Sequence, residues 1–122
     1  MKQLVLVFIG GGAGSALRFL ISRFLNTSTG IPYGTLSVNL LGSLLIGFLF
    51  GLSLKQNLLS TNSMLLLATG FCGGFTTFSA FTYENQVLIK NGEFFNFLLY
   101  GMGSVFLGIG AVYLGFLLSK LF

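Results

Sequence analysis

Charged residues are scarce in this 122-residue sequence, which has two acidic and six basic residues and is 54% hydrophobic. Charged residues make up only 7% of the chain, whereas soluble domains carry about 25%. An apolar sequence with so few charges cannot cover a water-exposed surface, so an ordinary soluble domain is excluded. The six basic residues are also too scattered to form a nucleic-acid-binding patch, and we expect no nucleic-acid partner.

Histidine is absent, and Cys72 is the only cysteine. A disulfide within the chain is therefore excluded, and the usual ligands of a zinc or haem site are lacking. No nucleophile–base pair and no metal-binding cluster is present either, so the sequence does not favour an enzyme.

Long uncharged runs occupy most of the chain, and about 20 apolar residues suffice to span a bilayer as a helix. The apolar start resembles a signal peptide, but it continues into further apolar chain, and we expect a retained first helix. The sequence predicts an all-α integral membrane protein, a single domain over 1–122. The four expected spans are 4–25, 33–54, 63–88 and 95–118.

The third expected span contains Gly70–Phe81, a stretch with three glycines, two adjacent threonines and a serine. These residues weaken a helix interior, so we expect the helix to be broken near its middle. Irregular backbone at bilayer depth occurs only where it is buried in protein or lines a watery cavity. Phe78 and Phe81 follow, three residues apart and so on one helix face. Core packing is the ordinary explanation for such a pair.

The second span has polar residues at four-residue spacing, Thr35, Asn39 and Ser43. An amide in hydrocarbon must find partners. On composition, Asn39 is more readily explained as a hydrogen-bonding group between helices, although its polar neighbours favour a polar pathway. A shorter stripe, Tyr100 and Ser104, occurs in the fourth span.

In the first span, Gly10 and Gly14 lie on one face, and we expect them to allow close helix packing. Arg18 follows four residues later. We expect its side chain to snorkel to the membrane interface, with a buried ion pair or a pore mouth as alternatives.

The basic residues divide evenly between the two ends of the predicted helices, so the positive-inside rule gives no preferred orientation. Lys2, Lys55 and Lys120 fall at one end, and Arg18, Arg23 and Lys90 at the other. No internal repeat supplies the symmetry that transporters use. We therefore expect insertion in both orientations (dual topology) and an antiparallel homodimer.

Four groups of residues resemble the CrcB/Fluc family of small fluoride channels, along nearly the whole chain. They are Gly11–Gly14 with Arg18, Gly34–Asn39 with Gly42, Gly70–Phe81 with Glu84, and Tyr100 with Ser104. The third group is the most specific of the four.

The resemblance implies a dual-topology antiparallel dimer with two fluoride pores and a central sodium ion. It places Asn39, Phe78 and Phe81 in the pore lining. Hydroxyl groups implied to continue the pathway are those of Ser79, Tyr100, Ser104 and Thr35. The sodium ligands implied are the backbone carbonyls of Gly73 and Thr76. Ala80 stands where many relatives have a hydroxyl residue, so the hydroxyl track is shorter here or uses Thr82. Arg18 and Glu84 are expected at the pore mouth or in structural roles.

Two functions are compatible with these features. The first is a passive channel that lets cytoplasmic fluoride leave the cell and so lowers its toxicity. Amide and hydroxyl donors could replace the water around fluoride, and the positive edges of phenyl rings could face the anion. The alternative is a small proton-coupled exporter, also with four spans and dual topology. An exporter of cations needs a carboxylate in its pathway, and the only embedded carboxylate, Glu84, lies late in the third span.

Overall fold

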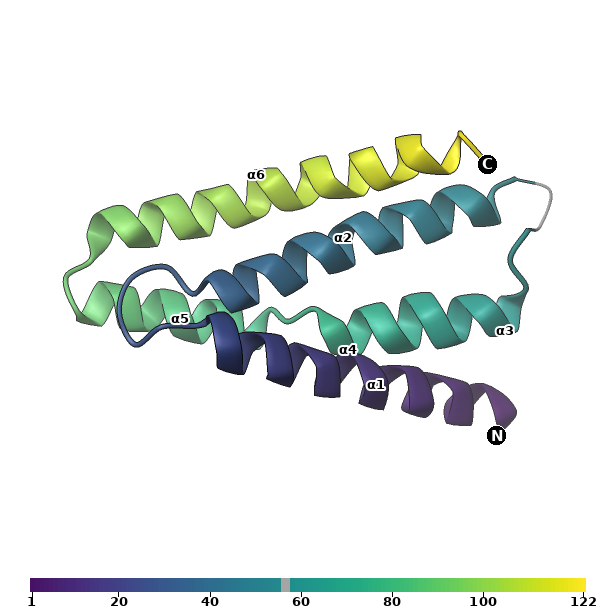
Figure 1. Ribbon diagram of the computed structural model, residues 1–122, viewed down its shortest axis with the longest axis horizontal. Coiled ribbons are helices and arrows are strands. Elements are labelled where there is room, and N and C mark those ends of the chain that lie inside the picture. The colour runs from purple at the N-terminus through teal and green to yellow at the C-terminus, as the bar shows by residue number, and fades with distance from the viewer. Residues whose placement is uncertain (56–57) are drawn as a thin grey trace.

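The protein is a bundle of four long helical segments, one of them interrupted (Figure 1). The structure, a computed structural model, describes residues 1–55 and 58–122. Its helices are α1 (Lys2–Leu25), α2 (Tyr33–Ser53), α3 (Thr61–Met64), η1 (Leu65–Cys72), α4 (Gly73–Phe75), α5 (Ser79–Lys90) and α6 (Phe94–Ser119). α3, η1, α4 and α5 follow one another as the third long segment.

All four long segments are long and apolar enough to cross a membrane, with mean hydropathy between 1.5 and 1.9. The prediction of four spans is confirmed, and each observed segment begins and ends within two residues of the expected position. Both chain termini lie at the same end of the bundle, and the α1–α2 and α5–α6 connections lie at the opposite end (Figure 1).

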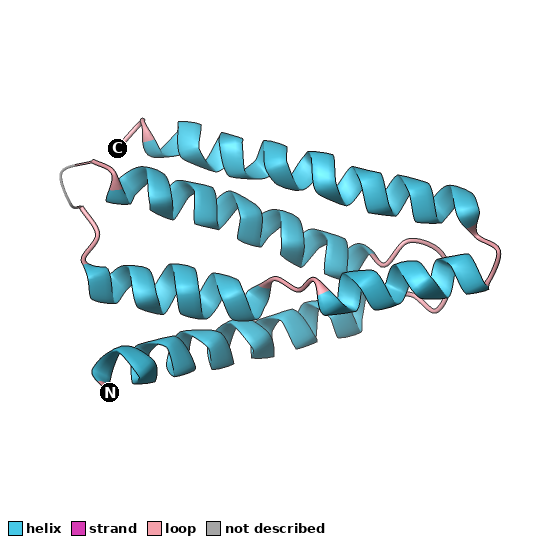
Figure 2. Ribbon diagram, turned by 180° about the vertical axis from the view of Figure 1, so that it is seen from behind, coloured by secondary structure: helices cyan, strands magenta, loops and turns pink. Residues whose placement is uncertain are grey.

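The third segment is interrupted at residues 76–78, which the ribbon shows as a loop between two helices (Figure 2). The prediction of a broken third helix is confirmed. Only part of the expected reason holds, because Gly70, Gly73 and Gly74 are all helical and the interruption falls at the two threonines. The helix ends after these glycines, at Thr76, where the backbone becomes extended.

Glycines allow α1 to touch the third segment backbone to backbone. A Cβ added to Gly10 would collide with the carbonyl of Leu66, and one added to Gly14 with the carbonyl of Phe71. The contact is reciprocal, because a Cβ on Gly74 would collide with the carbonyl of Gly11. Gly10 and Gly14 therefore pack as expected, and Gly74 serves the same contact from the other side.

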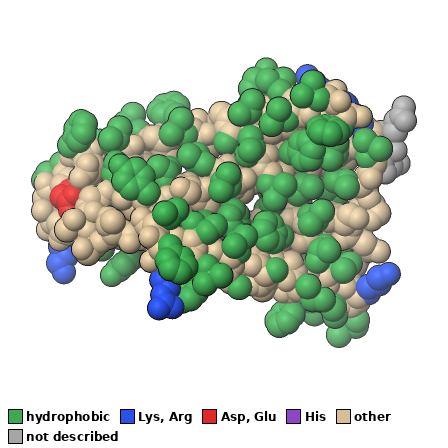
Figure 3. All heavy atoms as spheres, viewed as in Figure 1, with side chains coloured by type: hydrophobic (Ala, Val, Ile, Leu, Met, Phe, Trp, Pro, Cys, Tyr) green, Lys and Arg blue, Asp and Glu red, His purple; other side chains and the backbone are tan. Residues whose placement is uncertain are grey.

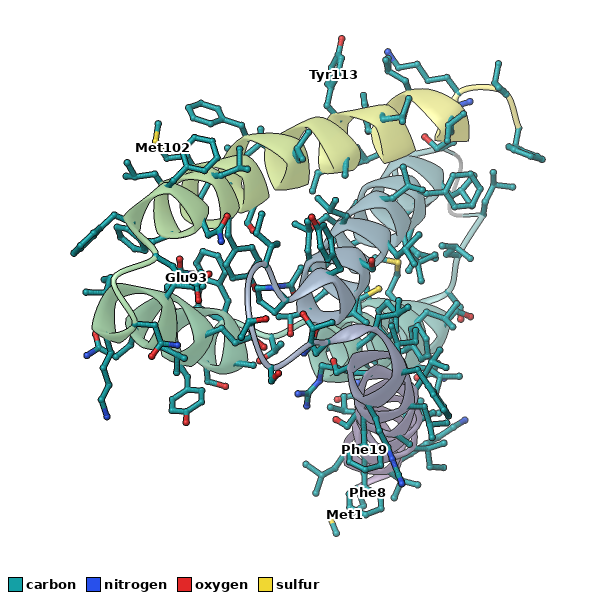
Figure 4. All side chains as sticks on the ribbon, turned by 60° about the vertical axis from the view of Figure 1, so that its left-hand side comes forward. Met1, Phe8, Phe19, Glu93, Met102 and Tyr113 are labelled. Atoms are coloured by element: carbon teal, nitrogen blue, oxygen red, sulfur yellow. The ribbon has the colours of Figure 1, made fainter. Side chains whose placement is uncertain are left out.

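A second close contact joins α2 to α6. Gly47 leaves no room for a Cβ beside the backbone of Val112, and Gly115 leaves none beside the carbonyl of Leu44. The core between the helices is small, as expected for helices that also face lipid. Apolar side chains are spread over the outer face (Figure 3). Phe8 and Phe19 point away from the bundle on α1, as do Met102 and Tyr113 on α6 (Figure 4).

We expect the α1 contact to be sensitive to a single methyl group. Gly14→Ala should lower the free energy of unfolding in detergent micelles by about 1–3 kcal/mol, because its Cβ has no space beside Phe71. Gly12→Ala is the matched control, since a Cβ at Gly12 meets nothing within 4 Å. Equal stability of the two variants would contradict this account of the packing.

Candidate functional site

Asn39 on α2 pairs with the backbone of the interruption through both ends of its side-chain amide. The Thr77 N–H donates to Asn39 Oδ1 at 2.8 Å, and Asn39 Nδ2 donates to the Thr77 carbonyl at 3.0 Å. A residue in the loop thereby obtains both hydrogen bonds that helical neighbours would otherwise supply. The structure places Asn39 between helices, as its amide chemistry favoured, and also on the wall of a hollow described below.

The hydroxyl group of Thr77 accepts a hydrogen bond from the Ala80 N–H at 3.2 Å, in the first turn of α5. A threonine oxygen is a favoured partner for the free N–H groups at a helix start. The Ser79 and Thr77 hydroxyl groups also lie 3.3 Å apart. The start of α5 is therefore fixed by side chains of the interruption itself.

Arg18 on α1 contacts the other side of the interruption. Its Nε donates to the Gly74 carbonyl at 3.0 Å, and Ser15 Oγ donates to the same oxygen at 3.3 Å. Gly74 lies in the last turn of α4, where carbonyls lack helical donors. Arg18, which we expect to snorkel to the membrane interface, thus also contacts the end of α4 within the bundle.

A hollow of about 550 Å³ lies beside the interruption, between α2, the third segment and α6. Six residues singled out in the sequence line it, namely Asn39, Gly73, Thr76, Phe78, Phe81 and Ser104. Its other lining residues include Thr77, Ser43 and Cys72, and none carries a charge. The wall therefore combines apolar surface with isolated hydrogen-bonding groups.

Phe78 and Phe81 form a short aromatic row that ends at Tyr100. The ring centroids of Phe78 and Phe81 lie 5.9 Å apart, and the Phe81 and Tyr100 rings meet edge to face at 5.2 Å. The side chain of Phe78 is 75% exposed, which is unusual for a phenylalanine that only fills a core. The row therefore lines the hollow with Phe78 and Phe81 and meets α6 at Tyr100.

Ser104 contributes to the wall of the hollow a hydroxyl group that has no hydrogen-bond partner in the described part of the chain. Its oxygen is buried, so an unmet hydrogen bond is costly unless water or an ion supplies it. Asn85 Oδ1 is the other such buried atom among the described residues, although Asn85 Nδ2 donates to the Phe81 carbonyl at 2.8 Å.

Glu84 lies at the centre of a second polar cluster, whose residues are not among those that line the hollow. Thr35 Oγ1 donates to Glu84 Oε1 at 2.6 Å, and Tyr100 Oη donates to Glu84 Oε2 at 2.8 Å. Asn26 Nδ2 also contacts this cluster, 3.1 Å from Thr35 Oγ1 and 3.4 Å from Glu84 Oε1. Thr35 and Tyr100 are each only 1% exposed. The carboxylate thus accepts a hydrogen bond from each of the two buried hydroxyl groups.

The site residues expected from the sequence therefore divide between neighbouring places. One group lines the hollow, and Thr35, Tyr100 and Glu84 form the second cluster. Ser79 is exposed at the start of α5, and Arg18 supports the interruption from α1. Sequence reasoning missed Thr77 and Asn26. Thr77 lies three residues before Ala80, whose N–H donates to it in the first turn of α5. A threonine at this spacing before a helix is a capping signal, and it could have identified Thr77.

No group of three or more His, Cys, Asp or Glu side chains comes together in the part of the chain that the structure describes. Uncharged oxygens, from backbone carbonyls and from hydroxyl and amide side chains, are the hard ligands near the hollow. Gly73 and Thr76 line it and are candidates for that role.

Comparison with known proteins gives a consistent result. The family model described as CrcB-like protein, Camphor Resistance (CrcB), matches residues 5–116. The chain is 50% identical to a protein of Chlorobium phaeobacteroides named fluoride-specific ion channel FluC, over 97% of this chain and 93% of that protein. Proteins with the same name from Chlorobaculum tepidum and Phocaeicola vulgatus are 49% and 45% identical, covering 97% and 100% of those proteins.

We expect the Glu84 cluster to stabilise the bundle. Glu84→Ala should lower the free energy of unfolding by at least about 2 kcal/mol, because each buried hydroxyl group left without a partner costs about 1–3 kcal/mol. Glu93→Ala is the control, since among the described residues the Glu93 carboxylate accepts only from Asn96, three residues away. The expectation fails if the two alanine variants unfold at the same denaturant concentration in detergent micelles.

Proposed function

Because the chain belongs to the CrcB-like family, we propose that it is a fluoride-specific ion channel, a multi-pass protein of the cell membrane rather than an enzyme. Fluoride would move passively down its gradient, so that cytoplasmic fluoride leaves the cell. The observation that carries the proposal is the hollow beside the broken helix, which is lined by uncharged hydrogen-bonding side chains and two phenylalanine rings together.

Uncharged donors suit the passage of a small, strongly hydrated anion. Asn39 Nδ2 has two protons and uses one on the Thr77 carbonyl, so the other is free to face an anion. The Ser104 hydroxyl group is a second free donor on the same wall. Phe78 and Phe81 add positive ring edges, which attract an anion weakly. Several weak contacts in succession favour conduction, because a site that binds too tightly releases its ion slowly.

Thr35 and Tyr100 contribute to this pathway indirectly in our proposal. Each hydroxyl group has one proton, and each donates that proton to Glu84. While those bonds persist, the two groups turn lone pairs rather than protons to any anion nearby. We propose that they hold the Glu84 carboxylate away from the hollow. Ser79 remains a proposed donor at the start of α5, where the positive end of the helix dipole also favours an anion.

The proton-coupled exporter has less support. No acidic or basic residue lines the hollow, and the single embedded carboxylate is held by two buried hydroxyl groups. An exporter of cations needs a carboxylate that substrate and protons can reach in turn. The names of the similar proteins also refer to an ion channel.

We also propose an antiparallel homodimer with dual topology, in which a second copy covers the hollow. The even division of basic residues between the two ends supports insertion in both orientations. Exposed Phe78 and the open space beside Gly73, where an added Cβ would meet nothing within 4 Å, support a partner at this face.

A structural sodium ion at the centre of that dimer completes the proposal. Carbonyls of Gly73 and Thr76 from two chains would converge there, and their partial negative charges repel one another in a low-dielectric interior. A cation relieves this repulsion, and no charged side chain lines the hollow to supply it. Sodium, a hard cation from solution, suits oxygen ligands of this kind.

The proposed transport activity can be measured in liposomes loaded with fluoride or chloride. With valinomycin and a potassium gradient to balance charge, fluoride should leave rapidly, and chloride should stay inside. Asn39→Ala should slow fluoride efflux, whereas Ser37→Ala, on the same helix but away from the hollow, should not. Equal efflux of chloride, or efflux only with an imposed pH gradient, would contradict a fluoride-specific passive channel.

Dual topology can be measured with single cysteines in a Cys72→Ser background. We expect Ser28→Cys, in the exposed α1–α2 connection, to be labelled from both sides of the membrane in intact cells and inverted vesicles. Leu121→Cys, at the opposite end of the bundle, should behave in the same way. If each cysteine reacts from one side only, and the two sides are opposite, the chain has a single orientation.

A further inference from the structure

The hydrogen bonds of the interruption release two particular carbonyl groups. In an uninterrupted helix, the carbonyl of residue i accepts from the N–H of residue i+4. The N–H four residues after Gly73 belongs to Thr77, and it donates to Asn39 Oδ1 instead. The N–H four residues after Thr76 belongs to Ala80, and it donates to Thr77 Oγ1 instead. The side-chain oxygens of Asn39 and Thr77 thus accept the two hydrogen bonds that an uninterrupted helix would direct to the carbonyls of Gly73 and Thr76.

Neighbouring carbonyls of the interruption keep partners. The Cys72 carbonyl accepts from the Thr76 N–H at 2.9 Å and from Thr76 Oγ1 at 2.8 Å. The Gly74 carbonyl accepts from Arg18 and Ser15, and the Thr77 carbonyl accepts from Asn39. No such bond reaches the carbonyls of Gly73, Phe75 and Thr76 among the described residues. Of these three residues, Gly73 and Thr76 line the hollow and Phe75 does not.

We infer that Asn39 and Thr77 are positioning residues for a cation site, because they hold two N–H groups away from the carbonyls of Gly73 and Thr76. The inference rests on the proposed sodium ion and adds the residues that prepare its ligands. Asn39 governs the Gly73 carbonyl, and Thr77 governs the Thr76 carbonyl. Neither side chain needs to touch the cation.

The arrangement also links the cation to the proposed anion pathway. One side-chain amide, that of Asn39, fixes Thr77 and keeps one free N–H on the wall of the hollow. An ion that tightens either end of this amide restricts the other end. Such coupling is reciprocal by thermodynamic necessity, so any factor by which sodium changes the affinity for fluoride is also the factor by which fluoride changes the affinity for sodium.

Two matched variants of Thr77 test the inference without relying on transport. Thr77→Val keeps the shape of the side chain but removes the oxygen, so the Ala80 N–H loses its acceptor and the start of α5 no longer holds the neighbouring Thr76 carbonyl in place. Thr77→Ser keeps the oxygen. The readout is the sodium concentration that gives half of the sodium-dependent rise in Tm of the purified protein. We expect this concentration to rise about tenfold in Thr77→Val, the loss of roughly one hydrogen-bonding ligand, and to stay unchanged in Thr77→Ser.

Carbonyl chemical shifts separate the two positioning residues. Thr76–Thr77 is the only Thr-Thr pair in the sequence, so pairwise isotope labelling isolates the Thr76 carbonyl in solid-state NMR spectra. In the unmodified protein, sodium should shift the carbonyl signals of both Gly73 and Thr76. Thr77→Val should remove the response at Thr76 and preserve it at Gly73. Asn39→Ala should do the reverse, and Ser37→Ala should preserve both.

Each result bears on the inference separately from the proposed channel. A Thr77→Val protein with the sodium response of the unmodified protein would overturn it, as would unmodified protein whose Gly73 and Thr76 signals ignore sodium while fluoride efflux persists. Absence of fluoride efflux from the unmodified protein would instead overturn the proposed function. Should Asn39→Ala fail to fold, the comparison of Thr77→Val with Thr77→Ser still decides the outcome.

Discussion

Asn39 holds the interruption of the third helix by pairing its amide with both backbone groups of Thr77. The pair depends on a general constraint, which is that backbone polar groups at bilayer depth need a partner within the protein. Without it, three residues of irregular backbone would carry the cost of several unmet hydrogen bonds. With it, the chain keeps a loop where an apolar helix would otherwise continue, and that loop forms one wall of the hollow.

The glycine contacts make this pairing reachable. Gly10 and Gly14 bring α1 against the third segment, so that Arg18 meets the Gly74 carbonyl on one side of the loop. Gly42 lets α2 approach the loop from the other side, because a Cβ there would collide with the side chain of Thr76. The small residues therefore matter because they let neighbouring helices approach closely. They place two polar side chains of other helices where the broken helix needs donors and acceptors.

Much of the fold could be predicted from the sequence, because hydrophobic length and the scarcity of charge determine it. The four spans and the interrupted third helix follow from these features. The cause of the interruption followed only in part, since the threonines end the helix as expected but the glycines before them pack while helical. Helix propensity alone cannot distinguish a glycine that ends a helix from one that packs within it, because tertiary contacts decide between the two.

Side-chain partners in the site were harder to predict, since they depend on which helix faces meet. Asn39 and Ser104 lie on the wall of the hollow, in agreement with their place in the polar stripes. Thr35 and Tyr100 belong to the same stripes, yet both donate to Glu84. Arg18 Nε donates to the Gly74 carbonyl at the end of α4, a contact that its position in the sequence did not indicate. A pattern along one helix indicates a polar face, and only the packed structure shows which acceptor that face meets.

The central claim is that fluoride passes along the wall formed by the interruption, in contact with the free N–H of Asn39 and the edges of the two phenylalanine rings. It is tested most directly by the dipolar coupling between bound ¹⁹F-fluoride and isotope-labelled protein in proteoliposomes. The account predicts measurable coupling to Asn39 Nδ2 and to ring carbons of Phe78 and Phe81. Fluoride that couples only to residues outside the hollow, in protein that still conducts, would contradict it.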